Sequence, residues 1–500
     1  MKFPPVPLRA LPFARCRPLP GRPPRAPAAN ATLSAVSSKI SLPSRYEDLE
    51  PAFRGRLRPV EPLLHLVKQA AAGMAVSGGI RFLPIYGQSG SGKTSAAQEL
   101  STHLPECEVF TLTREAIESQ ESLNAAVHAQ WKRRLPPKLL IAVVDQYEEN
   151  VARRTDVPTR FVEALSLLDR GELRTNPTLF LWLTTSKEFQ GDLAEATSRN
   201  ERILVARSFE IAGPVQAAWP QIIEETFEFH NHGQMLADFD VLRDDLDEIS
   251  YASGTIGQAI EEVGRRLGPH ASRLQDISDY QVVMAWPVTG SRIDRILAFT
   301  LPGDGYKLDW NAFYRAHDQN AHVSLPFHAL NRARLYFDVR LVPIAVADLH
   351  ALSHDLENIG APLAPSYLER FKKSHLYSVV EGSYDPAAAS RLRARESKRA
   401  DDAATWYETV TDQPVLLGRR MARIFSNVGL PAKHEASVTA KNHTARTDIL
   451  VQRVGGGSPA KVLLELKAFS TKNTMPAAIR DAVRGTLRKY AQLGGFLERQ

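Results

Sequence analysis

Residues 81–95 read RFLPIYGQSGSGKTS, and this stretch decides the fold of the N-terminal half of the chain. An apolar run of strand length, residues 82–86, leads into Gly87-x-x-x-x-Gly92-Lys93-Thr94, and residues 95–100 (SAAQEL) have the composition of a helix. A strand, a glycine-rich loop ending in Lys-Thr and a helix, in this order, are the context of a phosphate-binding loop. The alternative is a glycine-rich turn that binds nothing, which would require all three features to be coincidental.

The loop offers the groups that hold the phosphates of a nucleotide such as ATP. Glycine lets the backbone adopt positive φ and brings N–H groups round a phosphate with no Cβ in the way. We expect Lys93 to reach the β- and γ-phosphates and Thr94 to offer its hydroxyl to Mg²⁺, while the following helix directs its positive end at the same anion. The predicted nucleotide-binding residues of the loop are Gly87, Gln88, Ser89, Gly90, Ser91, Gly92, Lys93 and Thr94.

Length and composition limit the class of protein. A chain of 500 residues is too long for one hydrophobic core, so about three domains are expected. The chain is 43% hydrophobic and 24% charged, as in soluble globular proteins, and no apolar run approaches the ~20 residues of a membrane span. Two cysteines, Cys16 and Cys107, cannot alone form a disulfide framework or a zinc site. We therefore expect a cytoplasmic protein with no membrane partner.

Positive charge gathers at the two ends of the chain. Residues 1–45 carry eight Lys/Arg and no acid, and residues 405–500 carry 15 Lys/Arg against 7 Asp/Glu, although the whole chain has a net charge of only +6. The C-terminal segment is therefore the better candidate for binding a polyanion. Residues 1–45 also contain ten of the 33 prolines, which favours a disordered arm and argues against the amphipathic helix of an organelle transit peptide.

Strands and helices alternate on either side of the phosphate-binding loop. Apolar runs predict strands at residues 106–112, 139–144, 178–183 and 207–211, with helices at residues 63–74, 115–131 and 161–168. This alternation predicts an α/β fold in which helices cover both faces of a parallel sheet.

Asp145 ends the strongly apolar strand at residues 139–144. A carboxylate at this tip, beside the phosphate-binding loop, is where a nucleoside triphosphatase holds Mg²⁺ through water. The alternative role of Asp145 is that of a helix N-cap. Gln146 follows Asp145, so the nearest residues that could polarise an attacking water are Glu148 and Glu149.

The loop together with DQYEE at residues 145–149 resembles the AAA+ and STAND branch of P-loop ATPases. The resemblance implies that Thr184 or Thr185 senses the γ-phosphate. It also implies that Arg199 is an arginine finger acting on a neighbouring subunit, hence a homo-oligomer, unless Arg199 is only a surface arginine. Residues 237–268, which are helical by pattern, would form the lid. Relatives place an arginine in a Gly-x-x-Arg setting there, but this chain has Gly257, consistent with slow turnover or use of ATP as a switch.

Residues 446–469 read RTDILVQRVGGGSPAKVLLELKAF and form the second motif. Two β-type runs flank glycines 455–457, which predicts a hairpin. If the hairpin is symmetric about residues 456–457, Asp448 and Glu465 lie opposite one another. Lys467 then shares the face of Glu465, because side chains alternate along a strand. Two carboxylates on one face repel each other unless a cation such as Mg²⁺ lies between them, where it can lower the pKa of a water molecule.

This second motif resembles the PD-(D/E)XK nuclease superfamily, with Asp448 as the first acid and Glu465-Leu466-Lys467 as the E-x-K. Predicted helices at residues 415–428 and 479–490 complete an α-β-β-α order. Tyr490 matches the Tyr of a Gln-x-x-x-Tyr found in many relatives, whereas Thr486 stands at the Gln position. The resemblance implies a Mg²⁺-dependent nuclease acting on DNA. RNA is an alternative substrate, because the residues of this face would contact only phosphate groups. The alternative is an ordinary hairpin whose Glu465 and Lys467 pair on the surface.

We therefore expect an α/β chain with a parallel-sheet ATPase core, a helical lid, an α+β middle region and a restriction-endonuclease-like C-terminal domain. The expected divisions are an arm (1–45), the core (46–215), the lid (216–275), the middle region (276–385), a linker (386–405) and the nuclease-like domain (406–500). The expected function is ATP binding and hydrolysis joined to a Mg²⁺-dependent DNA endonuclease, as in a prokaryotic restriction or antiphage defence effector. The alternative is a non-nucleolytic AAA+/STAND ATPase that acts as a signalling or assembly switch. The histidines between residues 317 and 354 show no spacing typical of metal ligands.

Overall fold

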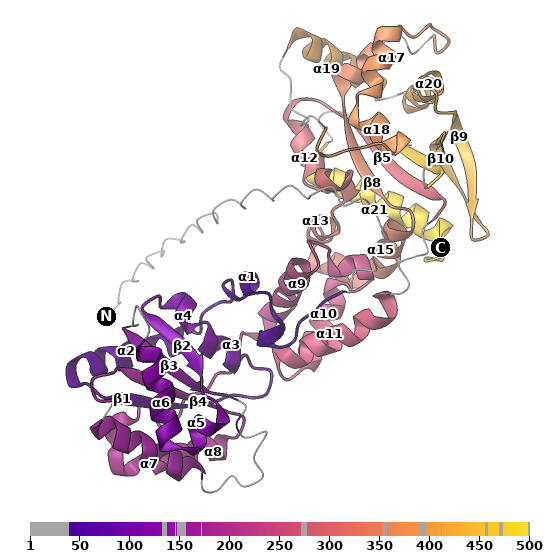
Figure 1. Cartoon of the computed structure of the whole chain (residues 1–500). Coiled ribbons are helices and arrows are strands. Elements are labelled where there is room, and N and C mark those ends of the chain that lie inside the picture. Colours follow the sequence, from indigo (N-terminus) through magenta and orange to yellow (C-terminus); the bar gives the residue numbers. More distant parts are fainter. Residues whose placement is uncertain are drawn as a thin grey trace, which may run out of the picture.

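Two β-sheets with a group of helices between them make up the described part of the chain (Figure 1). A computed structural model describes residues 40–498 except 133–137, 146, 148–156, 172, 272–277, 354–355, 357, 390–396, 412, 456–458 and 470–473. In this part of the chain, no helix is both long enough and apolar enough to cross a membrane.

The first sheet has four parallel strands in the order β1-β4-β3-β2. Its elements are η1 (Tyr46–Asp48), α1 (Pro51–Arg54), α2 (Glu61–Ser77), β1 (Ile80–Tyr86), α3 (Lys93–Gln98), α4 (Leu100–His103), β2 (Cys107–Thr111), α5 (Arg114–Glu118), α6 (Gln120–Trp131), β3 (Leu139–Val144), α7 (Val157–Arg170), β4 (Thr178–Thr184), α8 (Lys187–Ala196) and η3 (Ser198–Ile203).

Helices cover both faces of this sheet, which confirms the predicted parallel α/β core. Strands β3 and β4 are buried along their whole length, as expected for central strands of a parallel sheet. Side chains from α2, α3 and α4 pack on one face and side chains from α5 to α8 on the other. The sheet thus fixes the carboxyl ends of β1 and β3 next to each other across β4, at the edge where ligands bind in such folds.

Two sequence predictions for this core are wrong in detail. The helix predicted at residues 115–131 is two helices, because Ser119 interrupts it and its side chain accepts a hydrogen bond from Ser122 N as the N-cap of α6. The strand predicted at residues 207–211 makes only one isolated bridge to β1, between Glu210 and Tyr86. Its neighbourhood bonds to β1 at two separated places, Val205 N to Phe82 O and Tyr86 N to Phe209 O, and no continuous ladder forms.

A helical group follows the first sheet and has its own apolar core. Its elements are η4 (Gln216–Ala218), α9 (Trp219–His230), η5 (Leu236–Phe239), α10 (Arg243–Ala252) and α11 (Ile256–Ala271). We refer to residues 216–271 as the lid. Ile40 and Leu42 pack against the lid, and Ser41 exchanges two hydrogen bonds with the Asn231 side chain at 3.0 and 2.7 Å. The end of the expected arm is therefore bound to the lid, while residues 1–39 lie outside the described residues.

The second sheet has seven strands in the order β6-β7-β8-β5-β11-β10-β9. Its elements are β5 (Tyr280–Val288), η6 (Gly290–Arg292), α12 (Ile293–Leu297), β6 (Thr300–Leu301), η7 (Pro302–Asp304), β7 (Lys307–Leu308), α13 (Trp310–Arg315), α14 (Gln319–Ser324), α15 (Phe327–Tyr336), β8 (Arg340–Ala345), α16 (Val346–Ser353), α17 (Pro365–Lys372), α18 (His375–Glu381), α19 (Lys398–Val410), α20 (Pro414–Asn427), β9 (Ala432–Ala440), β10 (His443–Gln452), β11 (Lys461–Leu466) and α21 (Pro476–Leu493).

The predicted middle region and the predicted nuclease-like domain share this sheet, which corrects the expected division at residues 386–405. Strand β5 pairs in parallel with both β8 and β11, so it joins the two regions. The edge of β11 that faces away from β10 must find hydrogen-bond partners, and β5 supplies them. Part of the expected linker is the start of α19, where Ala403 is buried against α16 together with Tyr407.

Candidate functional site

The loop after β1 has the backbone that the sequence predicts. Gly90 and Gly92 have φ of +79° and +88°, which L side chains rarely adopt. Gly87 is required for a different reason. A Cβ there would lie 2.6 Å from the backbone oxygen of Ile211 and 2.7 Å from Oγ of Ser91. The loop therefore depends on glycine twice for conformation and once for close packing.

Lys93, Thr94 and Asp145 come together at the start of α3. The Lys93 ammonium donates to the carbonyl oxygens of Gly87 (2.7 Å) and Gln88 (3.0 Å). The Thr94 hydroxyl donates to Oδ2 of Asp145 at 2.7 Å, which joins the loop to the tip of β3. Residues 146 and 148–156 lie outside the described residues, so the alternative role of Asp145 as a helix N-cap stays open.

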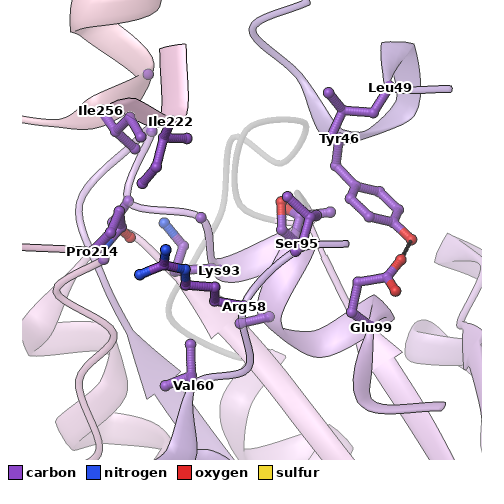
Figure 2. A pocket seen from close by; sticks show the side chains of 18 of the residues that line it. Tyr46, Leu49, Arg58, Val60, Lys93, Ser95, Glu99, Pro214, Ile222 and Ile256 are labelled. Carbon is purple, nitrogen blue, oxygen red and sulfur yellow. Dashed lines mark hydrogen bonds between the residues drawn. The ribbon is translucent and has the colours of Figure 1, made fainter. Parts of the chain in front are cut away.

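A cleft of about 1980 Å³ opens over this loop, larger than the 300–1,000 Å³ of many small-molecule pockets. The core, the lid and the segment before α2 all line the cleft. Figure 2 shows the side chains of Lys93 and Arg58 directed into it, with Ile222 and Ile256 of the lid on one side. On the other side the Tyr46 hydroxyl donates to Oε1 of Glu99 at 2.6 Å. The cleft thus has room for a whole nucleotide beside the loop.

The remaining residues predicted for this site fall into two groups. Thr185 lines the cleft, whereas the Thr184 hydroxyl oxygen accepts a hydrogen bond from Ser186 N at 2.9 Å, so Thr185 is the better placed of the two. Arg199 lies in η3, and its side chain is outside what the structure describes. Glu148 and Glu149 also lie outside the described residues.

Gly257 of the lid touches the phosphate-binding loop directly. Its N–H donates to the carbonyl oxygen of Gly90 at 3.1 Å, and a Cβ at Gly257 would lie 2.7 Å from Cα of Gly90. This contact gives a physical reason for the glycine at position 257, because no larger residue fits between α11 and the loop in this arrangement.

The hairpin of β10 and β11 has the register that the sequence predicts. Ile449 pairs with Leu464, and the ladder continues to Gln452 and Lys461. Asp448 and Glu465 are next in this register, beyond the last backbone pair, and the N–H of Leu466 donates to Oδ2 of Asp448 at 2.8 Å. The predicted opposition of the two acids is thereby confirmed, while their chemical roles stay predictions.

Within the described residues, three side chains donate hydrogen bonds to Glu465. Lys489 Nζ and the Tyr490 hydroxyl, both on α21, each lie 2.6 Å from its Oε1, and Lys467 Nζ lies 3.4 Å from its Oε2. The Glu465 side chain is only 5% exposed. The alternative of a surface pair between Glu465 and Lys467 is therefore wrong, because the carboxylate is buried under α21.

The electrostatic environment distinguishes the two acids. Burial, and then the negative charge of Glu465, raise the pKa of Asp448 above its ordinary value. Burial also favours the neutral form of Glu465, but Lys467, Lys489 and the Tyr490 hydroxyl outweigh it and lower the pKa of that carboxyl. The negative charge of Glu465 therefore acts against ionisation of Asp448, and a cation between the two acids would relieve this repulsion.

The residues present fit a divalent cation such as Mg²⁺. Among the described residues no hydrogen bond reaches Oδ1 of Asp448, and Oε2 of Glu465 has only the long contact with Lys467. Mg²⁺ commonly uses one or two carboxylates and takes its other ligands from water and substrate phosphate. No group of three or more His, Cys, Asp or Glu in the described ranges is placed to hold a metal ion. The pair of acids would therefore need water and substrate phosphate as the remaining ligands.

Two residues were missed by reasoning from sequence alone. Lys489 lies next to Tyr490 in a basic helix, but the sequence does not say which of its cations reaches the hairpin. Arg58 lies between a short helix and α2, in a stretch with several arginines and no motif. Leu487 and Tyr490 are fully buried on α21, but Arg488 and Lys489 both lie between them, so the apolar pattern alone does not single out Lys489.

No protein-family model and no curated protein sequence matches the chain. Among solved structures, the ORC2 protein of Aeropyrum pernix in its ADPNP-ADP complexes is 11% identical, with 90% of this chain and 97% of that chain covered and a TM-score of 0.32. The ADP form of the same protein is 11% identical, with 76% and 97% covered and a TM-score of 0.30. CDC6P from Pyrobaculum aerophilum is 12% identical, with 90% and 98% covered and a TM-score of 0.29. All three TM-scores lie well below 0.5, so we draw no inference from these likenesses.

Proposed function

We propose that the chain is an AAA+/STAND-type ATPase whose second sheet carries a metal-dependent DNA nuclease site. The observation that carries the nuclease half is the meeting of Asp448, Glu465 and Lys467 beside α21, where hydrogen bonds hold Oδ2 of Asp448 and Oε1 of Glu465 in place and Lys467 lies beside Oε2 of Glu465. The ATPase half rests on the contact of Thr94 with Asp145 beside Lys93. A prokaryotic restriction or antiphage effector, in which ATP controls cutting, is the role that joins the two activities.

In the first site, the chain's own groups bind and orient the triphosphate of ATP. The loop N–H groups and the positive end of α3 face the phosphates, and Lys93 exchanges its carbonyl partners for phosphate oxygens. Thr94 and Asp145 would hold Mg²⁺, which neutralises the developing charge on the phosphates. Thr185 senses the γ-phosphate and Arg199 reaches it from a neighbouring subunit, so the active form is a homo-oligomer.

In the second site, the chain's groups position a phosphodiester for hydrolysis. Asp448 and Glu465 would hold Mg²⁺, which supplies charge neutralisation and a water of lowered pKa. Lys467 orients the attacking water, whose oxygen forms a bond to phosphorus while the bond to the leaving oxygen breaks and that oxygen takes up a proton. The basic C-terminal segment attracts the nucleic-acid backbone, and RNA is open to the same chemistry.

A cleavage assay on plasmid DNA with Mg²⁺, with and without ATP, tests the nuclease half. We expect Lys467→Ala to lose at least 100-fold in rate. Lys461→Ala is the matched control, because Lys461 lies at the other end of β11 and its ammonium packs over the Tyr280 ring instead of contacting the acids. Equal rates for wild type and Lys467→Ala, or no cleavage under any nucleotide condition, would contradict this half of the proposal.

Binding of a fluorescent ATP analogue tests the ATPase half. Lys93→Ala should weaken binding by at least 100-fold, since the cation facing the phosphates is lost. Lys68→Ala, an exposed lysine on α2 outside the cleft lining, should bind as wild type does. Unchanged affinity in Lys93→Ala would contradict the site.

A non-nucleolytic ATP switch is the second candidate, and a specific observation favours it. The lid contacts the phosphate-binding loop through Gly257 and also packs on the second sheet through Ala237 and Leu242. A nucleotide that moves the lid would therefore act on both. In this case Lys467→Ala and wild type would be alike in the cleavage assay, while ATP still changed the affinity for a protein partner.

A further inference from the structure

Lys489 is the cation of the second site that no motif predicts. Its ammonium lies 2.6 Å from Oε1 of Glu465, closer than Lys467 lies to Oε2, and its side chain is 30% exposed whereas Glu465 is 5% exposed. Lys489 therefore stands between the buried acid and the solvent from which a substrate arrives.

The charges of the site balance only when Lys489 is counted. Asp448 and Glu465 carry two negative charges, and Lys467 and Lys489 carry two positive charges. One divalent cation then brings the site to +2, which matches a phosphodiester at −1 and an attacking hydroxide at −1. A second divalent cation would leave the site at +4, with no charge in the substrate to match it.

The geometry opposes a second cation as well. In two-metal sites the ions lie about 3.5–4 Å apart and clamp the attacking and leaving oxygens. A second ion on Glu465 would need its Oε1, and that oxygen already accepts from both Lys489 and the buried Tyr490 hydroxyl. The Lys489 ammonium thus stands where a second ion would have to bind.

We propose that Lys489 takes the place of a second divalent cation, so that the site binds one metal ion and Lys489 contacts a phosphate of the nucleic acid. This inference rests on the proposed nuclease function. It separates two roles on one carboxylate: Oε2 of Glu465 remains for the metal, and Oε1 is held by Lys489 until a phosphate draws the ammonium away.

Two affinities measured on the full chain without nucleotide test the proposal. Mn²⁺ binding is measured by calorimetry, and binding of a duplex with non-cleavable phosphorothioate linkages is measured by fluorescence anisotropy. Lys489→Gln should bind Mn²⁺ about tenfold more tightly or take up a second ion, because a positive charge has gone. The same variant should bind the duplex about tenfold more weakly. Lys489→Arg, which keeps the charge, should restore the duplex affinity at least in part.

If Lys489 faces the substrate, its replacement should strengthen Mn²⁺ binding and weaken duplex binding. If Lys489 is only structural, its replacement should weaken both, because the site would be misfolded. Arg484→Gln is the control on the same helix, where Arg484 pairs with Asp481 instead of Glu465, and it should leave Mn²⁺ binding within twofold of wild type. Unchanged or weaker Mn²⁺ binding, or unchanged duplex binding, in Lys489→Gln would overturn the inference. Asp448→Asn separates the two proposals. If this variant takes up as much Mn²⁺ as wild type does, the nuclease proposal fails as well.

Discussion

Glu465 shows most clearly how single residues define the second site. Its carboxylate is buried, is tied to α21 by Tyr490 and Lys489, and still has an oxygen beside Lys467. A buried carboxylate is tolerated only when charged or hydrogen-bonding groups surround it. These partners therefore keep the Glu465 side chain ionised and fix its orientation. The site is thus preorganised by a helix that the E-x-K motif does not include.

Tyr490→Phe tests this preorganisation, because it removes one hydroxyl and keeps the ring. Hydrogen bonds to charged groups contribute about 1.5–3 kcal/mol, and Tyr490 is fully buried, so we expect a loss of about 2 kcal/mol in the free energy of unfolding. Tyr377→Phe is the control, since its hydroxyl bonds the less buried Glu381 on the same helix, and should cost less than 1 kcal/mol. Equal losses in urea denaturation would contradict the special role of Tyr490.

At the residue scale, the alternation of side chains along the two strands of the hairpin was enough to predict which residues lie opposite each other. The opposition of Asp448 and Glu465 followed from the symmetry of the hairpin about its glycines, and the register bears it out. Lys489 could not be predicted, because a basic helix presents cations on several faces and only its packing decides which one reaches the acids. The choice between Thr184 and Thr185 likewise depended on a local turn, in which Thr184 bonds to Ser186.

At the scale of elements, the contact between α11 and the phosphate-binding loop links the lid to the nucleotide site. The Gly257 N–H to Gly90 O bond exists only because neither residue has a Cβ. A nucleotide that reshaped the loop would act directly on this contact with the lid. Gly257 therefore serves close packing between the lid and the loop.

Gly257→Ala tests this contact. Glycine to alanine inside a helix ordinarily stabilises by about 0.5–1 kcal/mol, but here the new Cβ would lie 2.7 Å from backbone, so we expect a net destabilisation of about 1–3 kcal/mol and altered ATP affinity. Gly264→Ala on the same helix has nothing within 4 Å of its Cβ and should be stabilising. If thermal unfolding shifts upward equally in both variants, the close contact is not present in solution.

Elements with continuous apolar runs were predicted well, and polar ones were not. Strands β1, β3 and β4 are buried on both faces, so their sequences differ plainly from those of loops. Strand β9 (AKHEASVTA) was not predicted, because it is an edge strand with mostly polar or small residues and only two buried positions. The joining of β5 to β11 could not be predicted either, since their pairing spans about 180 residues of chain and leaves no local pattern.

At the scale of the whole molecule, the lid is connected to α15 by a cluster of charges. His328 contacts Asp245 at 3.2 Å and Asp240 at 3.8 Å, while Arg266 and Arg332 pair with the same two acids. Together with the apolar contacts of Ala237 and Leu242, this cluster joins the half with the glycine-rich loop to the half with Asp448 and Glu465 (Figure 1).

This connection should weaken at alkaline pH. Hydrogen bonds to Asp240 and Asp245 raise the pKa of His328 to about 9, from about 6.5 in an unfolded chain. Because the folded value is the higher one, the stabilisation is fully present below pH 6.5 and is lost as pH rises through 9. His328 is 43% exposed, so the contribution is about 1 kcal/mol at most. The melting temperature of His328→Gln should lie a few °C below that of wild type at pH 6.5 and should equal it at pH 10. A difference in melting temperature that does not depend on pH would contradict this role of His328.

The central claim is that one chain holds two separate sites for phosphate chemistry. Anomalous diffraction from crystals grown with Mn²⁺ and a non-hydrolysable ATP analogue tests it most directly. We predict one manganese beside Thr94 and Asp145 with the analogue's phosphates in the loop, and one manganese between Asp448 and Glu465. An occupied loop with no manganese between Asp448 and Glu465 at saturating Mn²⁺ would contradict the nuclease half of the account and leave an ATP-dependent switch.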